Sequence, residues 1–433
     1  MTALEASRPP GRFGRTLYAY WVLLRVLMSY VWVRFQSHFR SRAGTATLLK
    51  RKHRLNARRI HKAITKLQGL FIKVGQLISI LTNFLPEEFR SELSGLQDQV
   101  PPHPYQDIQK RLRDEFGREA PKGVFASFDE QPIAAASIGQ VHRATLQSGE
   151  EVAVKVQYPE IEELMKADLR ILRRVFDILE RWMPDQGLVE VYLEIRSMVV
   201  AELDFKREAQ NIQTIAENFQ NRPGVAFPEV VETRSTERVL TTTFQEGIKS
   251  SDLEALDEAG IPRRQFAERI IYAYCEQIFN DGIYHADPHP GNLLARLKKG
   301  EDDSSDQEDV EVVFLDFGAV AKVSETMRQG IADLVQGGIA HDTQRVLRAL
   351  RSMGFIAKTA DPDIYERIVD FFHQRFHEEI RVESFSFKDI QIDPRKGFEN
   401  LADLKRMDIS LRDFTRQFHV PKEWILLERT FLL

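Results

Sequence analysis

Two polar segments, each beside a run of strand-forming residues, constrain the fold of this chain more than any other feature. The first is YHADPHPGNLL, in which Asp287 and Asn292 are five residues apart. The second is LDFG, in which Asp316 ends the apolar run VEVVFL. Carboxylate and amide oxygens are ligands that the hard cation Mg²⁺ accepts. Asn292 and Asp316 are therefore candidate metal ligands, and Asp287 is a candidate catalytic base or orienting group.

Two further residues precede these segments in a fixed order. Lys155 lies on the apolar strand VAVKV, and Glu208 lies in the later helical segment AELDFKREAQN. A strand lysine, a helix glutamate, an H-x-D-x-x-x-x-N loop and a DFG turn follow one another in protein-kinase-like active sites. The chain is therefore predicted to have an α+β, protein-kinase-like two-lobe fold, with a small β-rich N-lobe and a helical C-lobe.

Each motif has a simpler interpretation when it is taken alone. VAVK is a common amphipathic strand whose lysine is usually solvated, and DFG is a common turn. HADPHP could be a metal site through His285, Asp287 and His289, or only a proline-stiffened loop. The combination of motifs, in order and beside strands on the correct sides, favours the kinase-like fold.

The chemistry that this pattern predicts is phosphoryl transfer, which requires neutralised negative charge and reacting oxygens held in line. Lys155 can contact the α- and β-phosphates of ATP, while Glu208 orients the lysine. Asp287 would lie beside the acceptor oxygen, and Asn292 and Asp316 would hold Mg²⁺. The expected cofactors are therefore ATP and Mg²⁺.

The segment that follows the DFG turn bears on the acceptor. It reads AVAKVSETMRQGIADL, so a helix is predicted to begin within a few residues. The sequence has neither a long activation segment nor Ala-Pro-Glu, which protein kinases use to hold a peptide. A small-molecule or lipid acceptor, or ATP hydrolysis without an acceptor, is favoured over a peptide.

Hydrophobic periodicity predicts the remaining elements. IGQVHRATL and EEVAVKVQ are expected to form a β-hairpin, and FPEVV and RVLTTTF are strand-like. Helices are predicted over residues 161–182, over residues 189–219, and from Ser324 to the end. A long helix from Arg59 to Pro86 is predicted from one apolar stripe, which consists of Leu67, Phe71, Val74, Ile78 and Leu81.

The N-terminal region is basic and partly apolar. No acidic residue occurs between Ala6 and Lys66, and the stretch from Thr16 to Val33 is apolar and aromatic apart from Arg25. A central arginine costs roughly 2.5–3.5 kcal/mol on insertion scales, so this stretch is borderline as a spanning helix. Its aromatic residues and flanking arginines favour the membrane interface over a spanning helix, a signal peptide or a helix packed on the protein's own surface.

Composition excludes two classes of protein. The net charge of −4 gives no basis for binding nucleic acid. The single cysteine, Cys275, excludes an intrachain disulfide and fits a reducing compartment. A chain of 433 residues is expected to form more than one domain.

Six motifs together resemble those of the UbiB family (AarF/ABC1 type), atypical kinase-like proteins linked to ubiquinone biosynthesis. They are KVGQ, AAASIGQVHRA, VAVKVQYP, ELDFKREA, HADPHPGN and LDFGAV, and the similarity runs from about Arg58 to near the C-terminus. The resemblance implies a KxGQ helix, here Lys73 and Gln76, that lies across the active site where a peptide would dock. It also implies an ExD motif, here Glu202 and Asp204.

The resemblance further implies a nucleotide site with an adenine-reading hinge within residues 242–247. If the KxGQ helix is buried, Lys73 needs a carboxylate, because an unpaired buried charge is very costly. The family supplies Glu202 as that partner. Besides Lys155, the cofactor-binding residues implied are the alanine-rich loop Ala134, Ala135, Ala136 and Ser137, together with Lys73, Gln76 and Glu202.

The expected organisation has four parts. They are a basic, apolar membrane-associating segment (1–57), a helical extension with the KxGQ motif (58–115), a kinase-like N-lobe (116–246) and a kinase-like C-lobe (247–433). Bacterial members of the family often carry C-terminal transmembrane helices, whereas this chain stops at ILLERTFLL within a helical pattern. The N-terminal segment would then supply the contact with the cytoplasmic face of a membrane, as a peripheral or N-terminally anchored protein.

The function that the resemblance implies is an ATP-binding atypical kinase or ATPase that supports isoprenoid-quinone (ubiquinone) biosynthesis at a membrane. Protein phosphorylation is disfavoured. Its partners would be membrane lipids or isoprenoid-quinone precursors, together with enzymes of quinone biosynthesis. Two alternatives stay open, a small-molecule or lipid phosphotransferase and a nucleotide-binding pseudokinase scaffold, and the intact Lys155, Asp287, Asn292 and Asp316 argue against the scaffold.

The alanine run predicts restrained nucleotide handling. Alanine adopts positive φ less freely than glycine, so the loop is expected to be stiffer or more helical, with its backbone farther from the phosphates. The substitution Ala135→Gly is therefore expected to raise the affinity for ATP, which equilibrium titration measures. Unchanged affinity would mean that the alanines serve packing alone.

Overall fold

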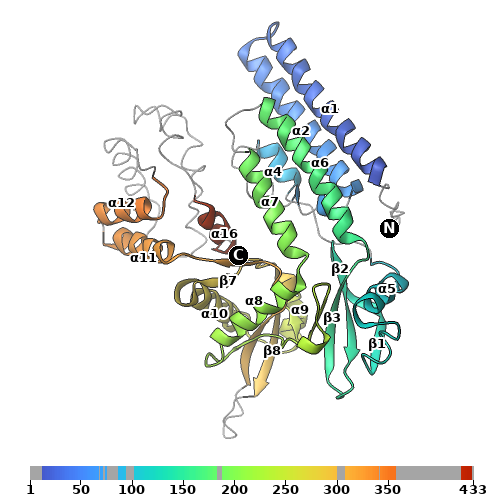
Figure 1. Cartoon of the computed structure of the whole chain (residues 1–433). Coiled ribbons are helices and arrows are strands. Elements are labelled where there is room, and N and C mark those ends of the chain that lie inside the picture. The colour runs from blue at the N-terminus through green and yellow to red at the C-terminus, as the bar shows by residue number, and fades with distance from the viewer. Residues whose placement is uncertain are drawn as a thin grey trace. The chain divides into compact units, whose positions relative to one another are not determined.

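The computed structural model divides into two compact units (Figure 1). The first combines Met1–Thr214 with Phe227–Glu246, and the second combines Ile215–Ala226 with Gly247–Leu433. The structure describes residues 12–67, 69–71, 74–75, 86–93, 102–182, 188–299, 308–340, 342–356 and 421–431.

The first unit contains a four-stranded antiparallel sheet in the order β1-β2-β3-β5. β2 and β3 form the predicted hairpin, with Thr145 opposite Glu151. Every second residue of β3, namely Val152, Val154 and Val156, is completely buried, as expected for a strand with one face in the core. The strands are β1 (Ser127–Ala135), β2 (Gly139–Thr145), β3 (Glu151–Gln157) and β5 (Val239–Thr243).

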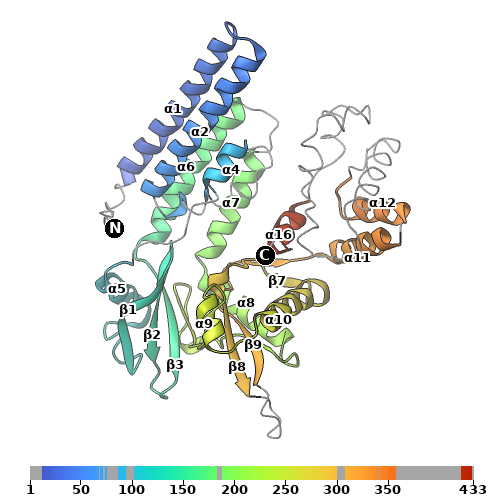
Figure 2. The ribbon, with the colours of Figure 1, turned by 180° about the vertical axis from the view of Figure 1, so that it is seen from behind.

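Several helices accompany this sheet in the same unit. They are α1 (Arg12–Ser37), α2 (Arg42–Leu67), α4 (Glu87–Leu93), α5 (Tyr105–Phe116), α6 (Ile161–Trp182), α7 (Leu188–Glu202), the short η1 (Glu232–Arg234) and α8 (Phe205–Asn218), whose residues from Ile215 on belong to the second unit. α1 and α2 form an antiparallel hairpin, and α6 runs beside α1 (Figure 1 and, from behind, Figure 2). α5 packs on β3.

Two predicted helices are interrupted. The helix expected from Arg59 to Pro86 ends at Leu67, because Gly69 adopts a left-handed conformation with φ +56° that closes a helix. Residues 70–71 and 74–75 are helical again. The helix expected over residues 189–219 is broken between α7 and α8, where the chain turns and a new helix is capped.

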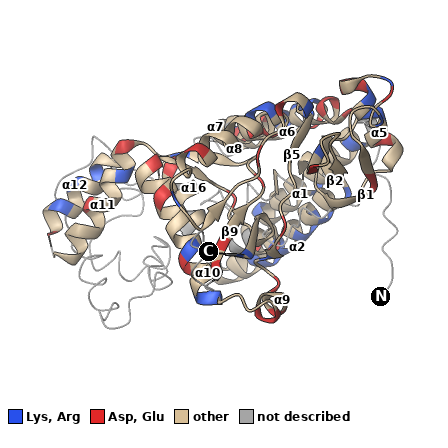
Figure 3. Cartoon of the chain, turned by 90° about the horizontal axis from the view of Figure 1, so that it is seen from below, with Lys and Arg blue, Asp and Glu red and all other residues tan. Residues whose placement is uncertain are grey.

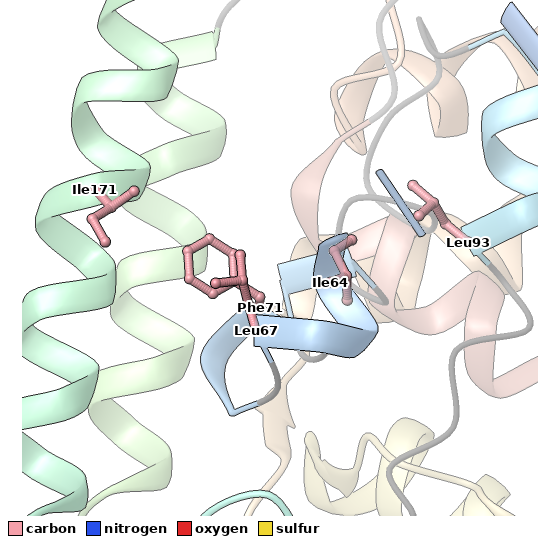
Figure 4. Close-up of a cluster of buried hydrophobic side chains, with 5 residues drawn as sticks. All are labelled: Ile64, Leu67, Phe71, Leu93 and Ile171. Atoms are coloured by element: carbon pink, nitrogen blue, oxygen red, sulfur yellow. The ribbon is translucent and has the colours of Figure 1, made fainter. Parts of the chain in front are cut away.

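The predicted apolar stripe at the first break belongs to the core. One buried cluster consists of Ile64, Leu67, Phe71, Leu93 and Ile171 (Figure 4). These side chains come from α2, the segment after it, α4 and α6, so the cluster joins helices that are distant in sequence. Val74 is buried as well, whereas Ile78 and Leu81 lie outside the described residues.

A buried ion pair ties α1 to the helices around it. The Arg15 guanidinium donates to both carboxylate oxygens of Asp168 in α6 and to the Leu67 carbonyl at the end of α2. Both charged side chains are almost completely buried. Burial raises the pKa of Asp168, and hydrogen bonding to the adjacent guanidinium opposes that rise. α1 is thus held by a polar contact in addition to its apolar packing.

The second unit contains a four-stranded sheet in the order β4-β9-β8-β6 and a two-stranded sheet of β7 and β10. The strands are β4 (Val225–Ala226), β6 (Ile248–Lys249), β7 (Ile283–His285), β8 (Leu293–Lys299), β9 (Glu308–Phe314) and β10 (Val320–Lys322). The helices are α9 (Leu253–Glu258), α10 (Arg263–Cys275), the π-helical η2 (Glu276–Asp281), the 3₁₀ turn η3 (Pro290–Asn292), α11 (Glu325–Ile339), α12 (Thr343–Ser352) and α16 (Lys422–Phe431).

β8 and β9 are the strand-forming runs expected beside the two polar segments HADPHPGN and LDFG. The prediction of a strand over FPEVV, residues 227–231, is wrong: β4 ends at Ala226, before this segment, and within it Val230 makes only an isolated bridge. Pro228 lies between them, and proline has no N–H to donate to a sheet. α11 begins as predicted, directly after Ser324, whose hydroxyl caps the helix. Residues 357–420 of the expected helical tail lie outside the described part of the chain.

The Arg15–Asp168 pair gives a stability prediction. Arg15→Met leaves a buried carboxylate without its cation, so the free energy of unfolding is expected to fall by about 3–5 kcal/mol. The double variant Arg15→Met, Asp168→Leu removes both charges and is expected to recover most of that loss. Urea unfolding followed by circular dichroism measures both effects. A double variant as unstable as the single one would show that the pair itself, and not charge burial, supplies the stability.

Candidate active site

Lys155 and Glu208 form a buried ion pair in the first unit. Lys155 projects from the middle of β3, and its Nζ atom lies 2.7 Å and 2.9 Å from the two carboxylate oxygens of Glu208 on α8. Only 5% of the glutamate side chain is exposed, against 18% of the lysine side chain. The Lys155 ammonium also lies 5.2 Å from the centroid of the Phe205 ring, a cation–π contact. The structure therefore brings these two predicted site residues together.

The first turn of α8 explains how Glu208 is placed at the sheet. Asp204 accepts hydrogen bonds from two backbone N–H groups of this turn, so it caps the helix. Gln157, the last residue of β3, donates from its side chain to the Leu203 carbonyl at 2.7 Å. The aspartate of the ExD motif thus has a structural role, and the glutamate, Glu202, is the half-buried last residue of α7.

The alanine run forms a tight hairpin turn. Ala134 and Ala135 end β1 and pair with β2, and the Ala136 N–H donates to the Gly139 carbonyl at 2.9 Å. Ser137 is buried within this turn. None of the three alanines has a positive φ. The expectation of a more helical loop is therefore wrong, because strand pairing holds the first two alanines extended.

The IGQVHRA motif also contains residues whose roles the sequence did not reveal. A Cβ atom on Gly139 would lie 2.4 Å from the carbonyl oxygen of Val156, so the hairpin requires glycine here. Gln140 and His142 are buried polar residues of β2. The His142 Nδ1–H donates to the Asp129 carbonyl, and its Nε2 accepts from the Gln140 amide at 3.0 Å. Burial lowers the pKa of His142, which agrees with this neutral form.

In the second unit, the ends of β8 and β9 bring the two predicted metal ligands to one place. Leu293 at the start of β8 pairs with Phe314 at the end of β9. The Leu315 N–H donates to the Asn292 carbonyl at 3.0 Å. Asn292 and Asp316 therefore flank the same end of this strand pair.

The Asn292 side chain also fixes the predicted catalytic aspartate. Its amide nitrogen donates to the carbonyl oxygen and to Oδ2 of Asp287, each at 3.2 Å. Oδ1 of Asp316 accepts from the Gly318 N–H at 2.9 Å, which shapes the DFG turn. Asp287, Asn292 and Asp316 are all half-buried. The structure thus brings together these three predicted residues, all of which belong to the second unit.

His285 joins the catalytic loop to the DFG turn. It is completely buried, its Nε2–H donates to the Asp316 carbonyl, and its backbone N–H donates to the Gln277 side chain. Its ring meets that of Phe317 edge to face at 5.2 Å. His289 uses Nδ1 to accept a nearby backbone N–H. In the described part of the chain, no three His, Cys, Asp or Glu residues are grouped as a metal site, so the histidine-based alternative finds no support.

The donors present fit Mg²⁺ bound together with a nucleotide. Asn292 and Asp316 offer hard oxygen ligands, and Mg²⁺ in phosphate-transfer sites takes one or two protein ligands, with phosphate and water oxygens as the others. Because the Asn292 nitrogen is directed at Asp287, its amide oxygen is the atom that it could present to a cation. Lys155, held by Glu208, is a fixed cation of the kind that neutralises phosphate oxygens.

Two features that the family resemblance implies, the KxGQ residues and the adenine-reading hinge, are not tested by the contacts above. Lys73 and Gln76 lie outside the described residues, so the pairing of Lys73 with Glu202 stays a prediction. The predicted hinge, residues 242–247, contains the passage of the chain from the first unit to the second. Its role in adenine recognition also stays a prediction.

The fold and these motifs define a protein-kinase-like protein. A family model described as the ABC1 atypical kinase-like domain matches residues 95–350, which is more than half of the chain. The chain belongs to this family of atypical kinase-like proteins, as the resemblance to UbiB (AarF/ABC1-type) proteins predicted.

Curated relatives agree with this membership. "Protein ACTIVITY OF BC1 COMPLEX KINASE 8, chloroplastic" of Arabidopsis thaliana is 34% identical over 357 residues, which cover 81% of this chain and 45% of that protein. "AarF domain-containing protein kinase 1" of Gallus gallus is 32% identical, over 70% of this chain and 57% of that protein. The chain spans about half the length of these curated relatives.

One solved structure is similar over most of the chain. It is "The complex structure of Rv3197-erythromycin from Mycobacterium tuberculosis", which is 26% identical with a TM-score of 0.53. The similarity covers 90% of this chain and 94% of that chain.

The cap at Asp204 gives a prediction about α8. Asp204→Ala removes an N-cap, which typically costs about 1 kcal/mol, so amide exchange in the first turn of α8 is expected to quicken about fivefold. Asp204→Asn retains a capping oxygen and should change little. Asp252→Ala, which removes the equivalent cap of α9, is the matched control and should leave α8 unchanged. Unaltered protection in Asp204→Ala would contradict the capping role. Hydrogen exchange read by mass spectrometry measures all three.

Proposed function

We propose that this protein is an ATP- and Mg²⁺-dependent enzyme of the phosphotransferase type, an atypical kinase or ATPase that acts at a membrane in isoprenoid-quinone biosynthesis. The observation that carries the proposal is the arrangement at the end of β8 and β9. There the Asn292 amide donates to Asp287, and the Asn292 carbonyl accepts from the N–H of Leu315, the residue before Asp316. The buried Lys155–Glu208 pair supports the proposal, because a lysine held in one position can neutralise the negative charge of phosphate oxygens.

Each of these residues has a chemical task in the proposed reaction. Lys155 would bind α- and β-phosphate oxygens, and Glu208 would keep its ammonium in place. Asp287, oriented by the Asn292 amide, would accept the proton of an acceptor hydroxyl or orient a water molecule. Asn292 and Asp316 would hold Mg²⁺, which when bound neutralises charge on the transferred phosphoryl group. His285 would keep Asp316 in position, because its ring nitrogen donates to the backbone carbonyl of Asp316.

The acceptor is proposed to be a lipid or small molecule, or water, in preference to a peptide. Only β10 and a short link separate Gly318 from the start of α11 at Glu325, so the chain has no room for a long peptide-holding segment there. Isoprenoid-quinone precursors are the proposed ligands because the chain belongs to the ABC1 family. Enzymes of quinone biosynthesis are the proposed partners on the same ground.

Phosphate transfer to a small hydrophobic molecule is the second candidate. The observation that favours it is the similarity to the Mycobacterium tuberculosis protein, whose solved structure is a complex with erythromycin. The erythromycin is bound by that other protein, and only the fold similarity extends such binding to this chain. A phosphorylated small molecule among the products would favour transfer over hydrolysis.

The test is ATP turnover with Mg²⁺ by the full chain, with and without anionic lipid vesicles and a phenol that resembles a quinone head group. Asp316→Asn is expected to lower turnover roughly 10²–10³-fold, because it weakens charge stabilisation in the transition state. Asp257→Asn, an exposed carboxylate paired with Arg263, is the matched control and should leave turnover unchanged. ATP binding without turnover under every condition would contradict the proposal and favour a pseudokinase scaffold.

A further inference from the structure

α1 presents an apolar face that no described part of the protein covers. Its outward side chains are between 38% and 63% exposed and recur every three or four residues: Leu17, Trp21, Leu24, Met28, Val31, Trp32 and Phe35. The opposite face packs on α2 through Val22, Val26 and Ala63. Scattered exposed apolar residues are normal, but a continuous stripe along a helix marks a contact surface.

Cations border this stripe. The Arg25 guanidinium lies over the Trp21 ring at 4.7 Å, and the Lys66 ammonium of α2 lies over the Tyr18 ring at 4.7 Å. The Tyr18 and Trp21 rings stack on each other at 6.1 Å. The aromatic edge of α1 therefore adjoins the basic side of α2. This order of apolar, aromatic and basic groups is the one that bilayer interfaces favour.

The basic side of α2 continues along the helix. Neither α1 nor α2 contains an acidic residue, and Figure 3 shows Lys and Arg along α2. A surface hollow of about 380 Å³ is lined by Lys50, Arg51, Arg54, Leu55 and Arg58 of α2 and by Glu88 of α4. It adjoins the side of α2 that packs on α4, so it is separate from the cations Arg25 and Lys66 that border the stripe.

A bilayer fits this surface better than a second copy of the chain. Two such hairpins in contact would bring cations against cations, whereas anionic phospholipid supplies both the missing charge and an apolar layer. Tryptophan at two points of the stripe, Trp21 and Trp32, is also typical of a membrane interface.

The packing of α1 argues for a helix that lies in the plane of the bilayer. Gly14–Ser37 is the one stretch of the described chain long and apolar enough to cross a membrane. However, α1 is joined to the polar helix α2 by Tyr30–His53 and Asn56–Ser29 hydrogen bonds, of 2.8 Å and 2.6 Å. Arg15 holds it to α6 through Asp168. A spanning α1 would either break these contacts or carry the basic α2 into hydrocarbon.

We propose that the α1–α2 hairpin is an in-plane docking surface for anionic phospholipid bilayers, with the α1 stripe in the interface and the two cations that border it, Arg25 and Lys66, on head groups. This inference specifies the membrane contact of the proposed function. The bilayer docking surface does not depend on ATP chemistry. An experiment that contradicts one of these two proposals therefore does not contradict the other.

The first experiment measures binding of the full chain to phosphatidylcholine vesicles with and without phosphatidylglycerol. Binding is expected to be at least tenfold tighter with phosphatidylglycerol and to weaken as salt rises. Leu24→Ser, Met28→Ser should weaken binding at least tenfold. The matched control, Leu193→Ser, Val200→Ser, changes equally exposed apolar residues of α7 and should bind as the wild type does. Arg25→Gln and Lys66→Gln should each weaken binding about fivefold.

The second experiment separates an in-plane helix from a spanning one. Variants that keep only Trp21 or only Trp32, with the other tryptophans replaced by Phe, are quenched by lipids brominated at known depths. An in-plane helix places both indoles at one shallow depth, whereas a spanning helix separates eleven residues by about 16 Å. Different depths, equal binding to neutral vesicles, or equal loss in the α7 control would each overturn the proposal.

Discussion

A carboxylate that is almost completely buried cannot keep its charge without a cation, and the Glu208–Lys155 pair meets this constraint in the first unit. Because Lys155 is fixed in the middle of β3, Glu208 fixes where α8 must lie. Gln157 makes a second contact from the same strand, to the Leu203 carbonyl at the start of that helix. Lys155 and Gln157 are two apart, so they share one face of the strand. The sheet thus positions both the end of α7 and the first turns of α8.

In the second unit, strand pairing and backbone hydrogen bonds position the site residues. Asn292 and Asp316 are brought together because β8 and β9 are antiparallel and their register places Leu293 opposite Phe314. His285 then joins the strand before the catalytic loop to the DFG turn, through a hydrogen bond between its ring nitrogen and the Asp316 carbonyl. The polar residues of the catalytic loop are therefore held by buried residues that include His285 and Phe317, whose rings are in contact.

The spacing of motif residues in the sequence predicted that Lys155 lies on a strand and that Asn292 and Asp316 lie beside strands. It could do so because strand periodicity and the intervals between motif residues are local properties. It failed where a distant partner or a cap decides the structure. Gly69 ends α2 although the apolar stripe continues beyond it, and α7 and α8 are separate because Asp204 begins a new helix. The alternation of Gln140 and His142 in the sequence indicates one polar face of a strand, but it does not indicate which groups they bond. Nothing local could have paired Arg15 with Asp168, which is 153 residues away.

The central claim is that ATP binding depends on Lys155, and that its dependence on Mg²⁺ comes from Asp316. Calorimetric titration of the full chain with ATP, in Mg²⁺ and in EDTA, tests it most directly. The account predicts tighter binding in Mg²⁺, a loss of that Mg²⁺ dependence in Asp316→Asn, and weaker binding under both conditions in Lys155→Met. Equal ATP affinity in the wild type and in Lys155→Met, with no effect of Mg²⁺ on either, would contradict it.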